Sequence, residues 1–353
     1  MQPAVPGTVI IFHIGSIGDT VVMLPCLHAI ARHFPDQRRI LLTNKPDSAR
    51  ASSAESVLGD SGLIHGAQYY PAGLGSPAAA LSLVRRLRST GARTLVYLAP
   101  RTTIWQVRRD LPFFRLAGIR RFLGLPENQR ALQRRVDPEG NVEPEARYLA
   151  RKLSRDILVD LATANWDLKL SAVERTVAEE HLAALPPGVP RVALAPGAKW
   201  ASKDWGEARW TQLLQQLRAR TPHICPVLLG AADEHALARR ILSQWNGPAL
   251  NLCGALSARE SAAVLGRCGV LVCHDSGPMH LAATQGTPCV ALFGNLNLPR
   301  QWFPWGDQHH VIHEARGVTF ISVAEVADAV SERVDELAQV APSRARHLYL
   351  VRS

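Results

Sequence analysis

The chain has 353 residues, 47% of them hydrophobic, and its 40 Lys and Arg residues against 30 Asp and Glu residues give a formal net charge of +10. That length accommodates two domains, each with a core of its own. No apolar run approaches the ~20 residues of a membrane-spanning helix, and the N-terminus lacks the basic flank and apolar stretch of a signal peptide, so we expect a cytoplasmic protein.

The first half of the sequence alternates short apolar runs with amphipathic segments. Strands are predicted at Thr8–Ile14, Arg39–Thr43 and Thr94–Ala99. Helices are predicted at Thr20–Phe34 and Ala79–Ser89. This alternation is typical of a parallel sheet whose strands are joined by crossover helices.

The first half is also the basic half. Residues 1–175 hold 24 Lys and Arg against 15 Asp and Glu, whereas residues 176–353 hold 16 against 15. Most of the excess lies at 85–135, with 13 arginines and two acids, Asp110 and Glu127. Arginine forks suit phosphate and carboxylate groups. The segment is either a solvated basic face or a surface for nucleic acid, an anionic membrane or an acidic acceptor.

The second half repeats the alternation after a break. A helix is predicted at Ser171–Leu185, and Pro186–Pro190 ends it as a stiff connection. Four strands are predicted beyond it, at Arg191–Pro196, Cys225–Gly230, Gly269–Asp275 and Pro288–Gly294. Ser322 and Glu325 have the spacing of a capping box for a last helix through about Val340. The expected organisation is a first domain at 1–170, an interdomain helix and linker at 171–190, a second domain at 191–340 and a basic tail at 341–353.

The six cysteines form no pattern. They include no C-x-x-C pair and lie mostly inside apolar segments, at Cys26, Cys225, Cys253, Cys268, Cys273 and Cys289. This spacing argues against a disulfide framework and against a zinc knuckle. We therefore predict buried free thiols.

Ligands of open α/β sheets bind beyond the carboxyl ends of strands, and three loops in that position carry polar residues. The first is "GSIGD" at 15–19, where Gly15 and Gly18 allow a ligand to approach the backbone. Asp19 lies near the start of the following helix. The loop matches neither G-x-G-x-x-G nor a P-loop. On this segment alone, Asp19 can be a helix cap, a catalytic base, or both.

The second loop, "PGAKWASKDWGEARW" at 196–210, places Lys199 and Lys203 after a strand. Lysines at a strand end can hold a diphosphate as point charges, or they can simply be solvated. A helix is expected to begin near Gly206. The loop alone does not decide between the two interpretations.

The third loop is "CHDSGPMHLAATQG". Three consecutive residues at 274–276 cannot converge as nucleophile, base and orienting group, so this is not a protease triad. Asp275 and His280 are five residues apart and lack the spacing of a helical metal site. A turn at 276–278 followed by a helix at 279–285 would direct free N–H groups at an anion. The loop therefore predicts a cradle for a diphosphate.

Taken together, the three loops resemble a known family. The blocks "GSIGDTVVMLP" (15–25), "PGAKWASKDW" (196–205) and "DSGPMHLAATQGTPCVALFG" (275–294) are similar to those of family nine glycosyltransferases, the lipopolysaccharide heptosyltransferases. The resemblance covers nearly the whole chain, and the D-[ST]-G-x-x-H block with T-P-x-x-A-L-F-G is its most specific part. It implies a GT-B fold, in which two Rossmann-like domains face each other across a cleft. The first would bind the acceptor and the second the nucleotide sugar.

The resemblance also implies sugar transfer with inversion, without a metal ion or another cofactor. Asp19 would be the base that deprotonates the acceptor hydroxyl. Donor-binding roles would fall to seven residues, Lys203, Asp233, Glu234, Asp275, Ser276, Gly277 and His280. Within this set Lys203 and the N–H groups of the turn would neutralise the diphosphate, and either Asp233 or Glu234 would bond the ribose hydroxyls.

Two positions depart from the family pattern. His13 stands where arginine or lysine is common, and Gly206 stands where proline usually follows K-x-W. His13 is interpreted as a strand-end histidine without a role. ADP-heptose is the family's typical donor, but no adenine motif can be read from the sequence. The sugar, the acceptor, the linkage and the oligomeric state are left open.

The arginine-rich segment fits an anionic glycolipid acceptor at the cytoplasmic face of the inner membrane, with peripheral membrane contact. Arg101, Arg108 and Arg109, near Trp105, are the candidate acceptor-binding residues. The alternatives are a transferase with another nucleotide sugar or acceptor, and a non-catalytic nucleotide-binding protein. Nucleic acid is disfavoured because no RNA-binding motif occurs, and an NAD-dependent oxidoreductase because G-x-G-x-x-G is missing.

Overall fold

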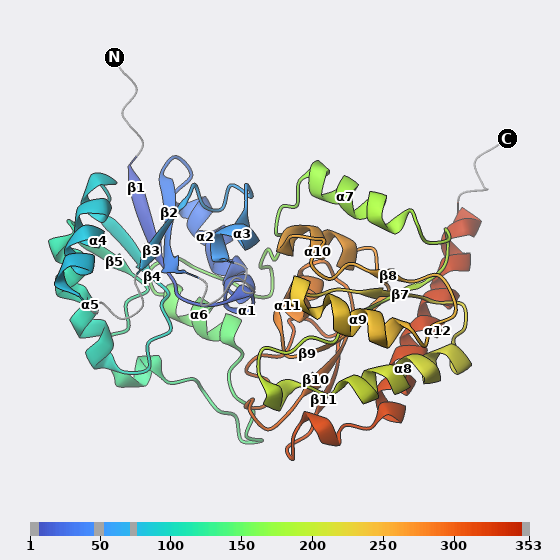
Figure 1. The fold of residues 1–353 in the computed structure, drawn as a ribbon. Coiled ribbons are helices and arrows are strands. Elements are labelled where there is room, and N and C mark those ends of the chain that lie inside the picture. The colour runs from blue at the N-terminus through green and yellow to red at the C-terminus, as the bar shows by residue number, and fades with distance from the viewer. Residues whose placement is uncertain (1–6, 46–52, 71–75, 348–353) are drawn as a thin grey trace. The chain divides into compact units, whose positions relative to one another are not determined.

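The structure, a computed structural model, describes residues 7–45, 53–70 and 76–347. The chain divides into two compact units, Met1–Lys169 and Leu170–Ser353 (Figure 1). Each unit contains one parallel sheet flanked by helices. This is the two-domain α/β class that the sequence predicted, and the division falls one residue before the expected boundary.

The first unit is built on a five-stranded sheet in the order β3-β2-β1-β4-β5. Its strands are β1 (Thr8–Phe12), β2 (Arg38–Asn44), β3 (Ala67–Tyr70), β4 (Thr94–Tyr97) and β5 (Arg121–Leu123). All neighbouring strands are parallel. The strand order reverses between β1 and β4, which is the switch point where such sheets bind ligands.

The helices of the first unit are α1 (Ile17–Val22), α2 (Leu24–His33), α3 (Ala54–Leu58), α4 (Pro77–Ser89), α5 (Ile104–Leu116) and α6 (Glu145–Leu153), with a 3-10 turn η1 (Gln129–Leu132). α4 and α5 pack on one face of the sheet, where Leu83 and Phe114 join a core with Phe12 of β1. The single helix predicted at Thr20–Phe34 is wrong. The segment forms two helices joined at Met23. Pro25 has no N–H to donate and is tolerated in the first turn of a helix, so a new helix begins there.

The second unit has a six-stranded sheet in the order β11-β10-β9-β6-β7-β8. Its strands are β6 (Arg191–Ala195), β7 (Cys225–Leu228), β8 (Leu250–Asn251), β9 (Val270–His274), β10 (Cys289–Phe293) and β11 (His310–His313). Neighbouring strands are parallel here too. The order reverses between β6 and β9, so this sheet also has a switch point.

The helices of the second unit are α7 (Ala172–Leu182), α8 (Glu207–Arg220), α9 (His235–Leu242), α10 (Ala258–Leu265), α11 (Gly277–Thr284) and α12 (Val323–His347), with 3-10 turns η2 (Ala201–Lys203), η3 (Ala232–Glu234) and η4 (Val318–Phe320). The expected interdomain helix belongs to this unit, since Arg259 of α10 pairs with Glu174 of α7. The expected tail at 341–353 is helical through His347, and residues 348–353 lie outside the described part.

Candidate functional site

The turn after β1 holds Asp19 in a fixed orientation. Ser16 is the N-cap of α1, and Asp19 is the third residue of that helix. The Asp19 Oδ2 atom accepts hydrogen bonds from the Ser16 backbone N–H at 2.7 Å and from the Ser16 hydroxyl at 2.8 Å. Asp19 therefore takes part in capping, as the sequence allowed, but as the third helical residue of a capping box whose N-cap is Ser16. The cap uses one carboxylate oxygen, and it leaves Asp19 half-buried at the switch point of the first sheet.

Gly15 makes room for this carboxylate. A Cβ atom at Gly15 would lie 2.2 Å from Asp19 Cβ and 2.5 Å from Asp19 Cγ, closer than two such atoms can approach. The Gly15 N–H donates to the Asn44 side-chain oxygen at 2.9 Å, which ties the turn to the end of β2. Gly18, the second glycine of the turn, is buried inside α1. Gly15 is thus required by packing around Asp19.

A buried basic group lies near this turn. His13 directly follows β1 and is 2% exposed, with its Nδ1 atom 3.4 Å from the Leu98 carbonyl oxygen. Burial lowers the pKa of His13, and the charge of Asp19 opposes that shift. Lys152 of α6 is also buried, and its pKa falls to about 8 because of desolvation, opposed by Glu145. His13 is therefore a buried strand-end residue that is electrostatically coupled to Asp19.

The switch point of the second sheet gathers three loops around one carboxylate. Asp275 follows β9, and its Oδ2 atom is bonded by the Lys203 ammonium and by the Asn297 side-chain amide. Lys203 belongs to the loop after β6, the neighbour of β9, and Asn297 to the loop after β10. The Lys203 and Asp275 side chains keep 26% and 12% of their surface exposed. A cation is thus held where a ligand of this sheet would bind.

The loop that carries Lys203 is anchored at both ends by His274. The Trp205 backbone N–H donates to His274 Nε2 at 3.0 Å, so the proton of the neutral ring is on Nδ1, which lies 3.4 Å from the Gly197 carbonyl oxygen. His274 is fully buried, and desolvation lowers its pKa to about 4. The Trp205 ring is buried as well and donates to the Ile321 carbonyl oxygen at 3.0 Å. These contacts fix the position of Lys203.

Gly206, one of the two departures from the family pattern, ends this loop. Its φ of +95° lies in a region that proline cannot adopt, and it is the N-cap of α8. Proline is therefore excluded at this position by the backbone, and the helix expected near Gly206 begins at the next residue, Glu207.

The helix after Asp275 begins two residues earlier than predicted. Ser276 is the N-cap of α11 and its hydroxyl donates to the His274 carbonyl oxygen, while Gly277 is the first helical residue. The N–H groups of the first turn of α11 thus begin beside the Lys203–Asp275 pair. His280, in contrast, is 4% exposed inside α11, and its ring lies 6.3 Å from that of Trp302. It packs behind the turn.

Glu234 lies at the same edge of the sheet. Its Oε2 atom accepts from the Ala231 N–H at 2.9 Å, and Cβ atoms placed on Gly197 or Gly230 would collide with its carboxylate. Gly197 and Gly230 follow β6 and β7, so the Glu234 carboxylate covers the ends of both strands. Asp233, its neighbour in η3, is exposed. Of the two acids considered from the sequence, Glu234 is the one directed onto the sheet edge.

The three candidate arginines do not form one cluster. Arg101 follows β4 and bonds the buried Asp110 carboxylate at 2.8 and 2.9 Å, as does the Tyr97 hydroxyl at 2.7 Å. Arg101 thus lies at the switch point of the first sheet, but its guanidinium is engaged. Arg109 is mostly exposed, 3.6 Å from Asp110, and Arg108 lies over the ring of Trp105. The last two belong to the outer side of α5.

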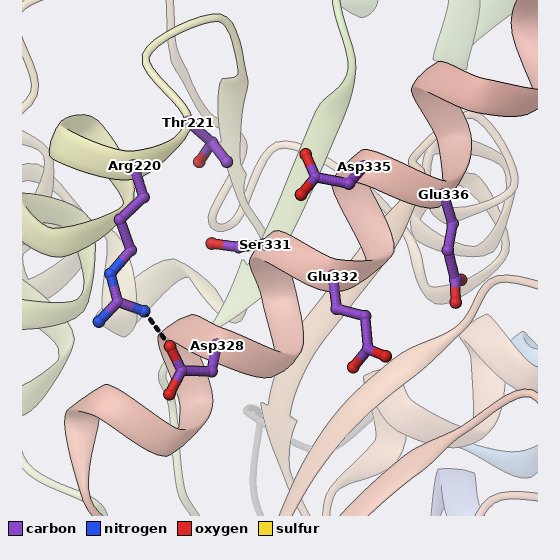
Figure 2. A pocket seen from close by; sticks show the side chains of 7 residues that line it. All are labelled: Arg220, Thr221, Asp328, Ser331, Glu332, Asp335 and Glu336. Carbon is purple, nitrogen blue, oxygen red and sulfur yellow. Dashed lines mark hydrogen bonds and ion pairs between the residues drawn. The ribbon is translucent and has the colours of Figure 1, made fainter.

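A separate hollow lies between the end of α8 and α12 (Figure 2). Its lining is acidic, and its one cation, Arg220, is paired with Asp328. Thr221 leads into β7, so the hollow is near the amino ends of the strands, away from the Lys203–Asp275 pair. Within the described part of the chain, no three His, Cys, Asp or Glu side chains gather as a metal site, and the six cysteines are free and buried. Nor is any described helix long and apolar enough to cross a membrane.

Sequence reasoning missed three residues of these turns. They are Asn44, His274 and Asn297. Each makes a hydrogen bond to a residue far away in the sequence, which only the folded structure brings close. Asn297 follows the end of a predicted strand, which is the signal that selected the other loops. The sequence gives His274 no role once the triad is excluded.

Two parallel sheets with polar residues at each switch point define a doubly wound α/β protein, whose ligands bind at the carboxyl ends of the strands. A family model described as glycosyltransferase family 9 (heptosyltransferase) matches residues 114–320. This is more than half of the chain, which therefore belongs to glycosyltransferase family 9.

Individual relatives agree with this assignment. The chain is 31% identical over 110 residues to lipopolysaccharide heptosyltransferase 2 of Salmonella typhimurium, an alignment that covers 30% of this chain and 31% of the relative. It is 32% identical over 118 residues to lipopolysaccharide heptosyltransferase 1 of Pseudomonas aeruginosa, covering 33% and 32%. The aligned part therefore spans about a third of these relatives' length.

Solved structures match the fold over nearly the whole chain. The family 9 glycosyltransferase of Veillonella parvula superposes with a TM-score of 0.69 at 17% identity, covering 93% of this chain and 98% of that one. The ADP-heptose lipopolysaccharide heptosyltransferase II of Escherichia coli gives 0.66 at 19% identity, covering 94% and 99%. The predicted GT-B fold class is thereby confirmed.

Proposed function

We propose that this protein is an inverting glycosyltransferase that moves heptose from ADP-heptose to a hydroxyl of a lipopolysaccharide-core-type acceptor. The observation that carries the proposal is the Lys203–Asp275 pair at the switch point of the second sheet, beside the N-terminus of α11. A cation and free backbone N–H groups at that point suit the charge of a diphosphate. The donor is proposed from the family's description as heptosyltransferases and from relatives solved with ADP and with an ADP-heptose analogue.

The second unit would bind the donor. Lys203 would exchange its contact with Asp275 for the diphosphate, and the N–H groups at Ser276 and Gly277 would meet the charge that develops on the leaving group. Glu234 is proposed for the ribose hydroxyls, because its carboxylate covers the ends of β6 and β7. Asp275 and His280 would support this turn, Asp275 by holding Lys203 in place before the donor binds and His280 as a buried residue of α11.

The first unit would supply the base. The acceptor oxygen attacks the anomeric carbon, and the bond from that carbon to the diphosphate breaks with its electron pair leaving on ADP. The hydroxyl proton passes to Asp19. Ser16 holds one oxygen of the Asp19 carboxylate, so the other can face the hydroxyl. Since Lys203 and α11 already provide positive charge for the leaving group, we propose that the reaction requires no divalent metal ion.

The acceptor and the location are the remaining parts of the proposal. Lipopolysaccharide cores are anionic, and Arg101, Arg108 and Arg109 would attract such a molecule to the first unit. We propose that transfer takes place at the cytoplasmic face of the inner membrane.

The test is a transfer assay in the presence of EDTA. The protein is incubated with ADP-heptose and a lipopolysaccharide core that lacks heptose, and the product is followed by mass spectrometry and its anomeric configuration by NMR. We expect one added heptose with inverted configuration and an equal amount of ADP. Transfer from another nucleotide sugar would change the donor, and ADP binding without transfer to any acceptor would identify a non-catalytic protein. A strict requirement for added metal ions would contradict the proposed mechanism.

A further inference from the structure

α5 has one continuous outer side with an unusual composition. Its inward side consists of Val107, Asp110 and Phe114, which are buried. The exposed residues recur at helical spacing on the opposite side, at Trp105, Arg108, Arg109, Pro112, Arg115 and Leu116. The outer side therefore contains arginines and apolar residues, and its composition includes no carboxylate.

Apolar side chains stand at both ends of this side. Trp105 is 73% exposed in the first turn of α5, and Leu116 is 55% exposed at its last residue. They are eleven positions apart, which is roughly 16 Å along the helix axis. The Arg108 guanidinium lies 5.5 Å from the centre of the Trp105 ring. The aromatic ring and the neighbouring cation thus point outward together.

The adjacent helix extends the same chemistry. α4 packs beside α5 on the same face of the sheet (Figure 1). It adds the exposed Leu81, Arg85 and Arg88. Within the described ranges, no carboxylate pairs with Arg85, Arg88, Arg108 or Arg115. Both helices therefore present exposed arginines together with at least one exposed apolar side chain.

We propose that these outer sides of α4 and α5, called the α4–α5 surface, dock the protein on an anionic lipid bilayer. The surface consists of Leu81, Arg85, Arg88, Trp105, Arg108, Arg109, Arg115 and Leu116. The inference rests on the proposed function, since a lipid-linked acceptor gives docking its purpose.

The chemistry favours a bilayer over the other anionic partners. Tryptophan rings settle at the headgroup level of membranes, where one edge is apolar and the other hydrated. Arginine stems can lie along the acyl boundary while their guanidinium groups contact lipid phosphates. Helices lying in the membrane plane show this combination of a cationic side and exposed Trp or Leu. A nucleic acid would engage the arginines, but it has no use for Leu81 and Leu116.

The first experiment is cosedimentation with vesicles of phosphatidylcholine alone and of phosphatidylcholine mixed with phosphatidylglycerol. The full chain should sediment with the anionic vesicles only, and added salt should weaken the binding. The variant Arg108→Gln, Arg109→Gln, Arg115→Gln should lose about fivefold affinity per arginine. Its control is Arg175→Gln, Arg218→Gln, Arg239→Gln, which removes the same charge from exposed positions of the second unit.

A second variant separates docking from simple charge attraction. Bromine-labelled acyl chains quench only tryptophans that reach the bilayer. We therefore expect the fluorescence of the wild type to be quenched by these vesicles, and the quenching to disappear in the Trp105→Phe variant. Thermal unfolding shows whether each variant is folded. Equal weakening by the control triple, retained binding of the Arg108, Arg109 and Arg115 variant, or tighter binding to DNA than to vesicles would each overturn the proposal. So would binding that requires lipopolysaccharide in the vesicle.

Nucleotide binding keeps this proposal distinct from the proposed function. If the protein binds ADP but not anionic vesicles, the proposed docking surface is wrong, and the proposed transferase function is unaffected. If the protein binds vesicles but no nucleotide, the proposed transferase function is wrong, and the docking surface is retained as a membrane contact of a protein with another function.

Discussion

Asp19 and Asp275 occupy corresponding places in the two units, and their surroundings differ. Each follows a strand at the switch point of its sheet, in a turn that leads into a helix. Asp19 accepts hydrogen bonds from its own turn, from the N–H and the hydroxyl of Ser16. Those of Asp275 come from other loops, as the Lys203 ammonium and the Asn297 amide.

The difference indicates that the two aspartates have different roles. Neutral donors orient Asp19 without supplying a countercharge, which suits a group that must accept a proton. A lysine partner makes Asp275 an anchor that places a cation beside the N-terminus of α11. Substitutions in the two turns should therefore affect different steps, chemistry in the first unit and nucleotide binding in the second.

The largest effect is expected from Asp19→Asn. The amide oxygen can still accept from Ser16, so the turn should keep its shape, but the base is lost. Transfer should fall by a factor between about 100 and 10 000, with unchanged ADP affinity. Initial rates and calorimetric titration measure the two quantities. Asp36→Asn, at an exposed position, is the control, and an Asp19→Asn variant with near-normal turnover would exclude Asp19 as the base.

Gly15→Ala should impair transfer without removing the carboxylate. The new methyl group would meet Asp19 Cβ at 2.2 Å, so Asp19 must move. Displacement of a catalytic group on this scale costs roughly 100-fold in rate. Gly7→Ala is the matched control, because its nearest neighbour is 3.9 Å away. Equal rates for both variants would show that the position of Asp19 is not critical.

Lys203→Ala should act on binding. Loss of a charged contact to the diphosphate should lower the affinity for ADP by roughly ten- to 100-fold. Lys199→Ala should have a smaller effect, because Lys203 is the lysine that bonds Asp275. Titration of both variants with ADP makes the comparison, and a larger loss for Lys199→Ala would reassign the diphosphate contact.

The smallest effect concerns stability. The pKa of His274 is about 4 in the folded chain, against roughly 6.5 for an unfolded histidine. The unfolded state therefore binds the extra proton first as the pH falls. The free energy of unfolding contributed by neutral His274 is complete above about pH 6.5 and declines toward pH 4, by up to roughly 3 kcal/mol.

Denaturant unfolding at several pH values tests this point. His274→Gln should be less stable than wild type at pH 7, and its stability should fall less steeply between pH 6.5 and 4. His223→Gln, at an exposed position, should follow the wild-type curve. Parallel curves for wild type and His274→Gln would show that His274 does not titrate in this range.

The central strands and the first turn were predictable because the information is local. β1, β6 and β9 are apolar runs buried on both sides of a sheet. Asp19 is hydrogen-bonded to Ser16, only three positions away. β8 has two residues and β11 is half histidine, so neither has a pattern that the sequence displays.

The site in the second unit was only partly predictable. Residue types left Lys199 and Lys203 equivalent, and only the family resemblance selected Lys203. The contact that separates them joins residues 72 positions apart, and Asn297 reaches Asp275 across 22 positions. Such contacts depend on which strands become neighbours at the switch point, and a single sequence does not show that.

In this mechanism the second unit binds a nucleoside diphosphate through Lys203 and the N-terminus of α11. The most direct measurement is calorimetric titration of the full chain with ADP, and with UDP, GDP and CDP for comparison, in EDTA. We expect selective binding of ADP without added metal. Binding of none of the four would contradict it, and preference for another nucleotide would retain the site but replace ADP-heptose as the donor.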